Sequence, residues 1–133
     1  MEANVIARRL YAAAASDPSA LLDLLAPDVV LHDPGSHPNG GAHRGRDAVL
    51  AFLGASSSAG ASMEVLDVMG GSHHAAAYVR VRADRGDARL DNLTVHLMRI
   101  EDGRVAEFWF HNRDQAHVDA FWSAVLPAGA GAA

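Results

Sequence analysis

The apolar residues of this chain change their period near residue 60, and this change constrains the fold more than any other feature of the sequence. Before it, apolar residues recur at spacings of three and four, as Val5, Ile6 and Leu10 do, which is typical of one helix face. After it, apolar and polar residues alternate, as in Tyr78–Arg82, which is typical of a half-buried strand. Helices followed by a run of strands predict an α+β arrangement, with helices covering one face of an antiparallel sheet.

The boundaries of the expected elements come from these periods and from the turn residues between them. We expect helices at 2–15, 18–26, 46–54 and 115–124, and strands at 28–33, 42–44, 62–69, 75–84, 88–100 and 104–112. Hairpin turns are expected at three pairs that contain glycine, Gly70-Gly71, Gly86-Asp87 and Asp102-Gly103. Gly54 is expected to end the third helix, which leaves 55–60 as a flexible connection. No repeat or linker divides the chain, so 1–125 is expected to be one domain and 126–133 a disordered tail.

Composition excludes several classes of function. The chain has 16 acidic and 11 basic residues and a formal net charge of -5, which argues against nucleic acid or an anionic membrane surface as the main partner. Cysteine is absent, so disulfides, thiol nucleophiles and thiolate metal sites are excluded. Charged residues near the start (Glu2, Arg8 and Arg9) predict that there is no signal peptide. No apolar run reaches the roughly 18 residues of a membrane span, so a cytoplasmic protein is the default expectation.

The segment Val29–Val49 contains the most closely spaced candidates for functional residues. Its apolar beginning, Val29–Leu31, turns polar at His32-Asp33, and Pro34-Gly35 stops the strand at once. A carboxylate at the tip of a rigid strand is both fixed and accessible, which makes Asp33 a candidate catalytic base. The alternative is that Asp33 only caps the turn, as Asp commonly does.

A second candidate lies on the predicted strand 88–100. His96 shares its parity with Asn92, Thr94 and Met98, while Val95, Leu97 and Arg99 face the other way. Polar side chains that share one face of an otherwise apolar strand either face solvent or line a pocket. A histidine in a pocket can donate a hydrogen bond to an oxyanion, whereas on an exposed face or at a dimer seam it would have no such role.

Other histidines do not make a metal motif. His32 has the opposite parity to Asp33 and is expected to face away from it, and His37 and His43 are expected to form a lid or rim in the Gly-rich loop. The chain has no His-x-His or His-Glu-x-x-His spacing, so we expect no metal site.

The order helix-helix-strand-helix-strands, with LLAPDVVLHDPG before the Gly-rich loop, resembles the nuclear-transport-factor-2-like superfamily over about residues 3–124. Within it the chain is similar to SnoaL-like and ketosteroid-isomerase-like proteins. This resemblance implies an NTF2-like cone, in which three N-terminal helices pack on a curved, mostly antiparallel sheet around a central pocket for a small apolar molecule.

The resemblance also implies roles for individual residues. In Δ5-3-ketosteroid isomerases an Asp followed by Pro after the apolar strand is the general base, and Asp33-Pro34 fills that place. Their oxyanion-donating Asp stands where this chain has His96, in His-Leu-Met-Arg-Ile followed by Gly103-Arg104. Their catalytic Tyr in the first helix is not matched, because Arg9 aligns there and Tyr11 is expected on another face.

On the last strand, Trp109 and His111 share one parity, and Phe108 and Phe110 share the other. By analogy with the isomerases we place Trp109 and His111 inside the cone, with Trp109 as an ordinary core residue as the alternative. Phe108 and Phe110 would then join Val95 and Leu97 on an apolar outer face. Such an apolar face would promote aggregation if it were exposed to solvent, so we expect a second copy of the chain to cover it in a homodimer.

The function implied by the resemblance is a cofactor-independent enzyme that moves a proton on a small apolar carbonyl compound, as an isomerase or a cyclase. The expected catalytic residues are Asp33, His96 and His111. The expected substrate-binding residues are Leu31, Phe52, Asn92, Thr94, Met98 and Trp109.

Two alternatives stay open. Gly45–Val49 also resembles limonene epoxide hydrolases, whose catalytic Arg-x-Asp pair is matched by Arg82-Ala83-Asp84, although His111 stands where they have a further Asp. A cross-strand ion pair in solvent is the other interpretation of Arg82 and Asp84. The second alternative is a non-catalytic ligand-binding or dimerisation module, because a fold does not settle function.

Overall fold

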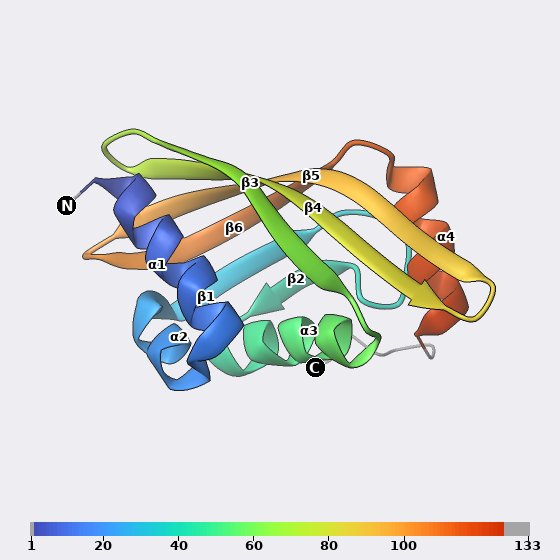
Figure 1. The fold of residues 1–133 in the computed structure, drawn as a ribbon. Coiled ribbons are helices and arrows are strands. Elements are labelled where there is room, and N and C mark those ends of the chain that lie inside the picture. The colour runs from blue at the N-terminus through green and yellow to red at the C-terminus, as the bar shows by residue number, and fades with distance from the viewer. Residues whose placement is uncertain (1, 127–133) are drawn as a thin grey trace.

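A computed structural model describes residues 2–126, in which four helices lie against a six-stranded sheet (Figure 1). The helices are α1 (Ala3–Ser16), α2 (Pro18–Leu24), α3 (Arg46–Ser58) and α4 (Gln115–Val125). The strands are β1 (Leu25–Asp33), β2 (Gly41–Arg44), β3 (Ser62–Gly70), β4 (His74–Arg85), β5 (Ala88–Glu101) and β6 (Arg104–Asn112). The expected α+β class is confirmed, and each predicted strand from 62 onward is found within one residue of its expected ends.

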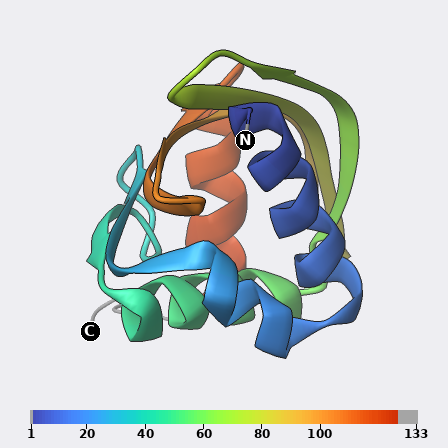
Figure 2. The same ribbon diagram turned by 90° about the vertical axis from the view of Figure 1, so that its left-hand side faces the viewer.

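The sheet is strongly curved. Its strand order is β2-β1-β6-β5-β4-β3, and every neighbouring pair is antiparallel except β1 with β6. Figure 2 shows the sheet arching over α1 and α4, which lie on its concave side, while α2 and α3 run along the open side below. This arrangement is the cone that the family resemblance implied, with a further helix, α4, inside the curve.

Helix α1 packs through a stripe of small and branched residues. The buried members of this stripe recur at spacings of three and four, namely Ala3, Ile6, Ala7, Leu10 and Ala13. Four of these five positions are alanine or leucine, both good helix formers, and the alanines let the helix approach β3 and β4 closely.

The predicted helix 18–26 is two residues too long. Helix α2 ends at Leu24, and β1 begins at Leu25, ahead of Pro27. Leu25 pairs with Val105 in the parallel ladder to β6, and its carbonyl oxygen accepts hydrogen bonds of 2.9 and 2.7 Å from the Arg46 guanidinium. These contacts stabilise an extended backbone that the local apolar pattern did not indicate.

Helix α3 passes through Gly54 and ends four residues later than expected. Gly60, with a φ of +83°, is the residue that stops it. The N–H groups of Gly60 and Ala61 bond to the carbonyl oxygens of Ser57 and Ser56, which is the Schellman pattern of a helix C-terminus. Residues 55–58, expected as a flexible connection, are therefore helical.

Apolar side chains form two clusters on the concave side of the sheet. The larger cluster joins α1, α3 and the strands and includes Leu25, Val79 and Met98. The smaller one surrounds α4, with Leu90, Phe121 and Trp122 among its members. No helix of residues 2–126 is both long and apolar enough to cross a membrane. The predicted tail, 126–133, falls outside the described residues from 127 onward.

Candidate active site

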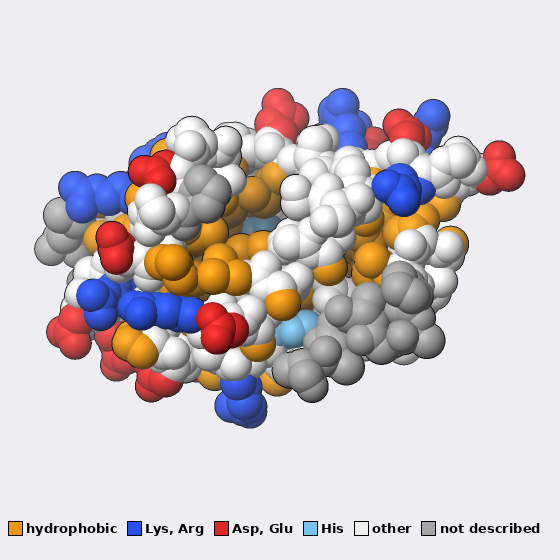
Figure 3. All heavy atoms as spheres, turned by 90° about the horizontal axis from the view of Figure 1, so that it is seen from below, with side chains coloured by type: hydrophobic (Ala, Val, Ile, Leu, Met, Phe, Trp, Pro, Cys, Tyr) orange, Lys and Arg blue, Asp and Glu red, His pale blue; other side chains and the backbone are white. Residues whose placement is uncertain are grey.

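A cavity of about 600 Å³ opens on the concave side of the sheet and reaches residues of both apolar clusters. Its wall is formed by residues of all four helices, of strands β1, β3, β4, β5 and β6, and of the loop between β1 and β2. Viewed from below, the molecule has a hollow with imidazole atoms inside it and apolar side chains around it (Figure 3). Such a mostly apolar hollow with a few polar groups is typical of a site for a small organic molecule.

Asp33 is the last residue of β1 and faces this cavity. Its side chain is buried, and its Oδ2 lies 3.0 Å from Nε2 of His37 in the following loop. Burial raises the pKa of the Asp33 carboxyl, and the contact with His37 lowers it by less, so the net direction is upward. A carboxylate in this state is a stronger base than one in water, which is the property that a proton-transfer site needs.

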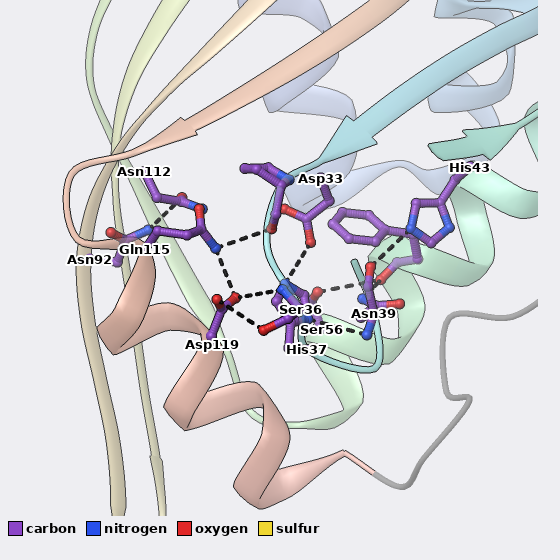
Figure 4. Close-up of polar contacts among 12 residues, drawn as sticks. Asp33, Ser36, His37, Asn39, His43, Ser56, Asn92, Asn112, Gln115 and Asp119 are labelled. Carbon is purple, nitrogen blue, oxygen red and sulfur yellow. Dashed lines mark hydrogen bonds and ion pairs between the residues drawn. The ribbon is translucent and has the colours of Figure 1, made fainter. Parts of the chain in front are cut away.

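The tautomer of neutral His37 is fixed by its neighbours. The backbone N–H of Asn39 donates to Nδ1 of His37 over 3.2 Å, so in the neutral ring the proton is on Nε2, the nitrogen next to Asp33. The Nε2–H is close to the carboxylate but is not aligned with it as a hydrogen bond. His37 therefore stabilises the negative charge of Asp33 through its nearby N–H dipole, and Figure 4 shows the two residues facing each other.

The second polar group of the cavity is a pair formed by His96 and Tyr11. The hydroxyl of Tyr11 lies 2.7 Å from Nδ1 of His96, and the imidazole stacks on Phe110 with ring centroids 3.8 Å apart. Burial lowers the pKa of His96 to about 3 and raises the pKa of Tyr11. Both groups are therefore neutral at physiological pH.

A neutral phenol and a neutral imidazole in contact always leave one donor for a ligand. If the phenol donates to Nδ1, the imidazole proton is on Nε2 and is free; if Nδ1–H donates, the phenol proton is free. Both side chains line the cavity. The pair can thus stabilise an oxyanion without carrying a charge itself.

The structure brings together five of the residues that the sequence singled out. Asp33, Phe52, Asn92, Thr94 and His96 all line the cavity. On β5 every second residue from Leu90 to Ile100 is buried, as the parity argument predicted. Leu31 and Met98, expected to bind substrate, are instead fully buried in the larger apolar cluster, because the narrow end of the cone is closed by packed side chains.

The expected placement of Trp109 and His111 inside the cone is wrong. The ladder between β5 and β6 starts with Glu101 opposite Arg104, and continued without interruption it would set Trp109 opposite His96. The register shifts after Ile100, so that β6 gains one residue and Phe110 lies opposite His96 instead. One extra residue exchanges the two faces of a strand, which puts Phe108 and Phe110 on the concave side.

Trp109 and His111 face a separate depression of about 540 Å³ on the other side of the sheet. His32 stacks on Trp109 there and contacts the Glu107 carboxylate, so His32 does face away from the cavity, as predicted. Asp33, Phe110 and Asn112 line both hollows, so the two hollows approach each other at these three residues.

Tyr11 and His37 are the functional candidates that the sequence interpretation missed. Tyr11 was expected on another face of the first helix, but it follows Ala7 by four residues and so continues the edge of the buried stripe. That spacing was a signal available in the sequence. No comparable signal was available for His37, because its approach to Asp33 depends on how the Gly-rich loop folds. His43 was expected at a rim but is buried, and its Nε2 lies 2.9 Å from the carbonyl oxygen of Asn39.

The residues of the epoxide hydrolase alternative lie outside the cavity. Arg82 and Asp84 are exposed, and Asp84 pairs with Arg89 across the β4–β5 hairpin at 2.9 Å. This arrangement matches the solvent-exposed ion pair that was the other interpretation of Asp84. Within residues 2–126 no three His, Asp or Glu side chains are grouped so that they could hold a metal ion.

The family model of the SnoaL-like domain matches residues 7–108 of the chain. The chain belongs to the SnoaL-like family. Among the relatives of this SnoaL-like protein, one from Nocardioides simplex that is named steroid Δ-isomerase is 36% identical over 108 residues, which cover 78% of this chain and 85% of that protein.

Solved structures agree with this assignment. Bal32a, from a soil-derived mobile gene cassette, has a TM-score of 0.83 and 30% identity and covers 90% of this chain and 95% of its own. An NTF2-like protein from Burkholderia xenovorans has a TM-score of 0.75 at 20% identity, with 90% and 95% of the two chains covered. The expected NTF2-like, SnoaL-like fold is thereby confirmed.

Proposed function

We propose that this protein catalyses acid/base proton transfer on a small apolar carbonyl compound, as an isomerase that shifts a carbon–carbon double bond into conjugation with a ketone. The observation that carries the proposal is that a buried carboxyl and a neutral imidazole–phenol pair line one cavity of about 600 Å³. The 36% identity to a protein named steroid Δ-isomerase supports a cyclic, mostly apolar ketone as the substrate.

In the proposed reaction Asp33 acts as the base. Its carboxylate removes the proton from the carbon between the carbonyl and the double bond, and the electrons of that C–H bond move onto the carbonyl oxygen as a dienolate. Asp33 then returns the same proton to the far carbon of the former double bond, which completes the shift. The reaction is redox-neutral, and the proton leaves and returns through one side chain, so the scheme needs no cofactor.

His96 and Tyr11 stabilise the dienolate in this scheme. The donor that the pair leaves free would bond to the developing oxyanion, and in a water-excluded cavity such a bond is stronger than in water. Because burial lowers the pKa of His96 to about 3, its imidazole is a weak base and does not take the proton that Asp33 carries. The same enolate chemistry would also serve a ring closure by a cyclase, which membership of the SnoaL-like family supports.

The test is conversion of 5-androstene-3,17-dione, followed by the ultraviolet absorbance of the conjugated enone product. We expect Asp33→Asn to lower kcat by about 10²- to 10⁴-fold, the usual effect of losing a general base, because the amide cannot accept the proton. Asp84→Asn is the control, since Asp84 is exposed on the β4–β5 hairpin and does not line the cavity.

Equal turnover by wild type and Asp33→Asn would refute the role of Asp33. Binding of the ketosteroid by the wild type without conversion would favour the ligand-binding alternative. Incorporation of labelled oxygen from water into an epoxide substrate would favour a hydrolase.

A further inference from the structure

Asn92 presents an amide oxygen in the cavity wall that has no partner. The side chain is on β5, it is only 5% exposed, and it lines the cavity. Its Nδ2 donates to Oδ1 of Asn112 over 2.9 Å, but its Oδ1 accepts no hydrogen bond from any residue of the described chain. A buried acceptor without a partner costs free energy, so its presence in a native structure needs an explanation.

The orientation of the Asn92 amide is forced by a chain of hydrogen bonds that ends on α4 (Figure 4). Gln115 Nε2 donates to the carbonyl oxygen of Pro34 over 3.1 Å and to the Asp119 carboxylate over 2.9 Å. A backbone carbonyl can only accept, so this end of Gln115 must be its NH₂ group. Its Oε1 must then accept from Asn112 Nδ2, as it does over 2.9 Å, and Asn112 Oδ1 must accept from Asn92.

A flip of any one amide in this chain would set two NH₂ groups or two oxygens against each other. The chain is also held firmly at its α4 end. The Asp119 carboxylate accepts from the backbone N–H of Ser36 over 3.2 Å, and a Cβ on Gly35 would lie 2.1 Å from Asp119 Oδ1. The β1–β2 loop and α4 are thus in close contact, and the free Oδ1 of Asn92 follows from the position of Pro34 rather than from chance.

Two further polar side chains in the same wall also offer acceptor oxygens to a ligand. The Thr94 hydroxyl donates to the carbonyl oxygen of His111 over 3.2 Å, which leaves its oxygen lone pairs free. Asn39, 2% exposed, directs its Nδ2 to the carbonyl oxygen of Phe52 at 3.5 Å, and its Oδ1 has no partner among residues 2–126. The Thr94 hydroxyl oxygen and the Oδ1 atoms of Asn39 and Asn92 can therefore each accept a hydrogen bond from a ligand, whereas the Tyr11–His96 pair can donate one.

The donor and the acceptors are separated along the cavity. His96 and Asn92 are four residues apart on one face of β5, which corresponds to roughly 13 Å at the usual rise of a strand. A ligand that satisfies both ends must be elongated and must carry an acceptor at one end and a donor at the other.

We propose that the cavity selects ligands that carry a hydroxyl group, or another hydrogen-bond donor, at the end opposite the carbonyl, and that Asn92 Oδ1 is the specificity-determining acceptor. The position of the carbonyl end rests on the proposed function, whereas the acceptor end follows from the hydrogen bonds alone. The substrate class is a hydroxylated cyclic ketone, and Asn92 acts in binding rather than in the chemical step.

The experiment compares the binding of two steroids that differ at one position. Testosterone carries a hydroxyl at carbon 17, and androst-4-ene-3,17-dione carries a carbonyl there; both already have the conjugated ketone, so neither requires turnover. We expect the wild type to bind testosterone about tenfold more tightly, the effect of the one hydrogen bond that only the hydroxyl can donate to Asn92. Titration calorimetry measures both dissociation constants.

Two variants test the origin of the preference. Asn92→Leu removes the acceptor at similar volume, and we expect it to lose affinity for testosterone while its affinity for the dione, the internal control, stays the same. Gln115→Met leaves Asn92 in place but frees the amide chain to reverse, and we expect it to reduce the preference as well.

Equal binding of the two steroids by the wild type, or a preference for the dione, would overturn the proposal. If neither steroid binds, the same comparison with 6-hydroxy-1-tetralone and 6-methoxy-1-tetralone decides it, and the absence of any preference for the hydroxyl ligand overturns the proposal there too. A preference for testosterone in a protein that does not isomerise 5-androstene-3,17-dione would refute the proposed reaction alone. Isomerisation without a preference would refute only the role of Asn92.

Discussion

At the residue scale, burial determines the charge of the polar groups in the cavity. His96 is 5% exposed, stacks on Phe110 and bonds to the Tyr11 hydroxyl, and burial lowers its pKa from 6.5 to about 3. Asp33 is shifted in the opposite direction, because burial disfavours its charge too and so raises its pKa. A base that holds its proton more strongly than usual therefore shares the cavity with a donor that stays neutral, which suits enolate chemistry.

The lowered pKa of His96 makes stability depend on pH. In the unfolded chain His96 takes up a proton near pH 6.5, but in the folded protein only near pH 3, so between these values the unfolded state binds more protons. Stability must therefore fall as the pH drops through this window. We expect wild type to lose up to about 1.4 kcal/mol of unfolding free energy per pH unit more than His96→Gln does.

Urea denaturation at several pH values between 3 and 7 measures this difference. His74→Gln is the control, since His74 is exposed at the start of β4 and should leave the pH slope unchanged. Identical pH slopes for wild type and His96→Gln would contradict a neutral, buried His96.

At the scale of the elements, hydrogen bonds across the fold set boundaries that local patterns leave open. The start of β1 ahead of Pro27 is held by Arg46, and the end of α3 is set by Gly60 rather than Gly54. The bulge in β6 is the most consequential case. A single extra residue of β6, Ala106, decides whether Trp109 or Phe110 lies opposite His96, and so which aromatic ring lines the cavity.

The end of α3 gives a prediction at this scale. Gly54 lies inside the helix, and a Cβ there would contact nothing within 4 Å, so Gly54→Ala should stabilise the protein by about 0.5–1 kcal/mol. Gly60, at φ +83°, is left-handed, so Gly60→Ala should destabilise it by about 1 kcal/mol or more. Thermal unfolding of both variants measures these two changes in stability. Destabilisation by Gly54→Ala together with stabilisation by Gly60→Ala would show that the helix stops at Gly54.

At the scale of the whole molecule, the convex face of the sheet carries a different set of apolar residues from the one expected. Phe108 and Phe110 face inward, so the apolar residues on this side are Val95 and Leu97 with Trp109, which pairs with Leu97 across the β5–β6 ladder. Tyr78, opposite Val95 on β4, is also exposed. A half-exposed apolar surface of this kind is typical of sheets that associate, which is why the homodimer stays our prediction.

Sedimentation analysis at micromolar concentration tests the homodimer. We expect a dimer for wild type and a monomer for Val95→Lys, because a charge in the middle of the convex face would have to be buried without a partner. Asp87→Lys, in the exposed β4–β5 turn, is the matched control and should stay dimeric. A monomeric wild type would contradict the prediction.

The sequence by itself determined the order of the elements, the ends of the four long strands, the parity of β5 and the position of Asp33 at a strand tip. Local periodicity and turn residues carry this information, because side chains alternate along a strand and glycine supplies left-handed turns. The family resemblance added the cone and its cavity.

Only the tertiary structure decided which side chains meet in that cavity. Tyr11 and His96 are 85 residues apart, and their hydrogen bond depends on how α1 crosses the sheet. His37 reaches Asp33 through the path of a loop, and the free oxygen of Asn92 is set by a chain of amides that ends on Pro34. Such contacts depend on register, bulges and the crossing of distant segments, which no local pattern in the sequence encodes.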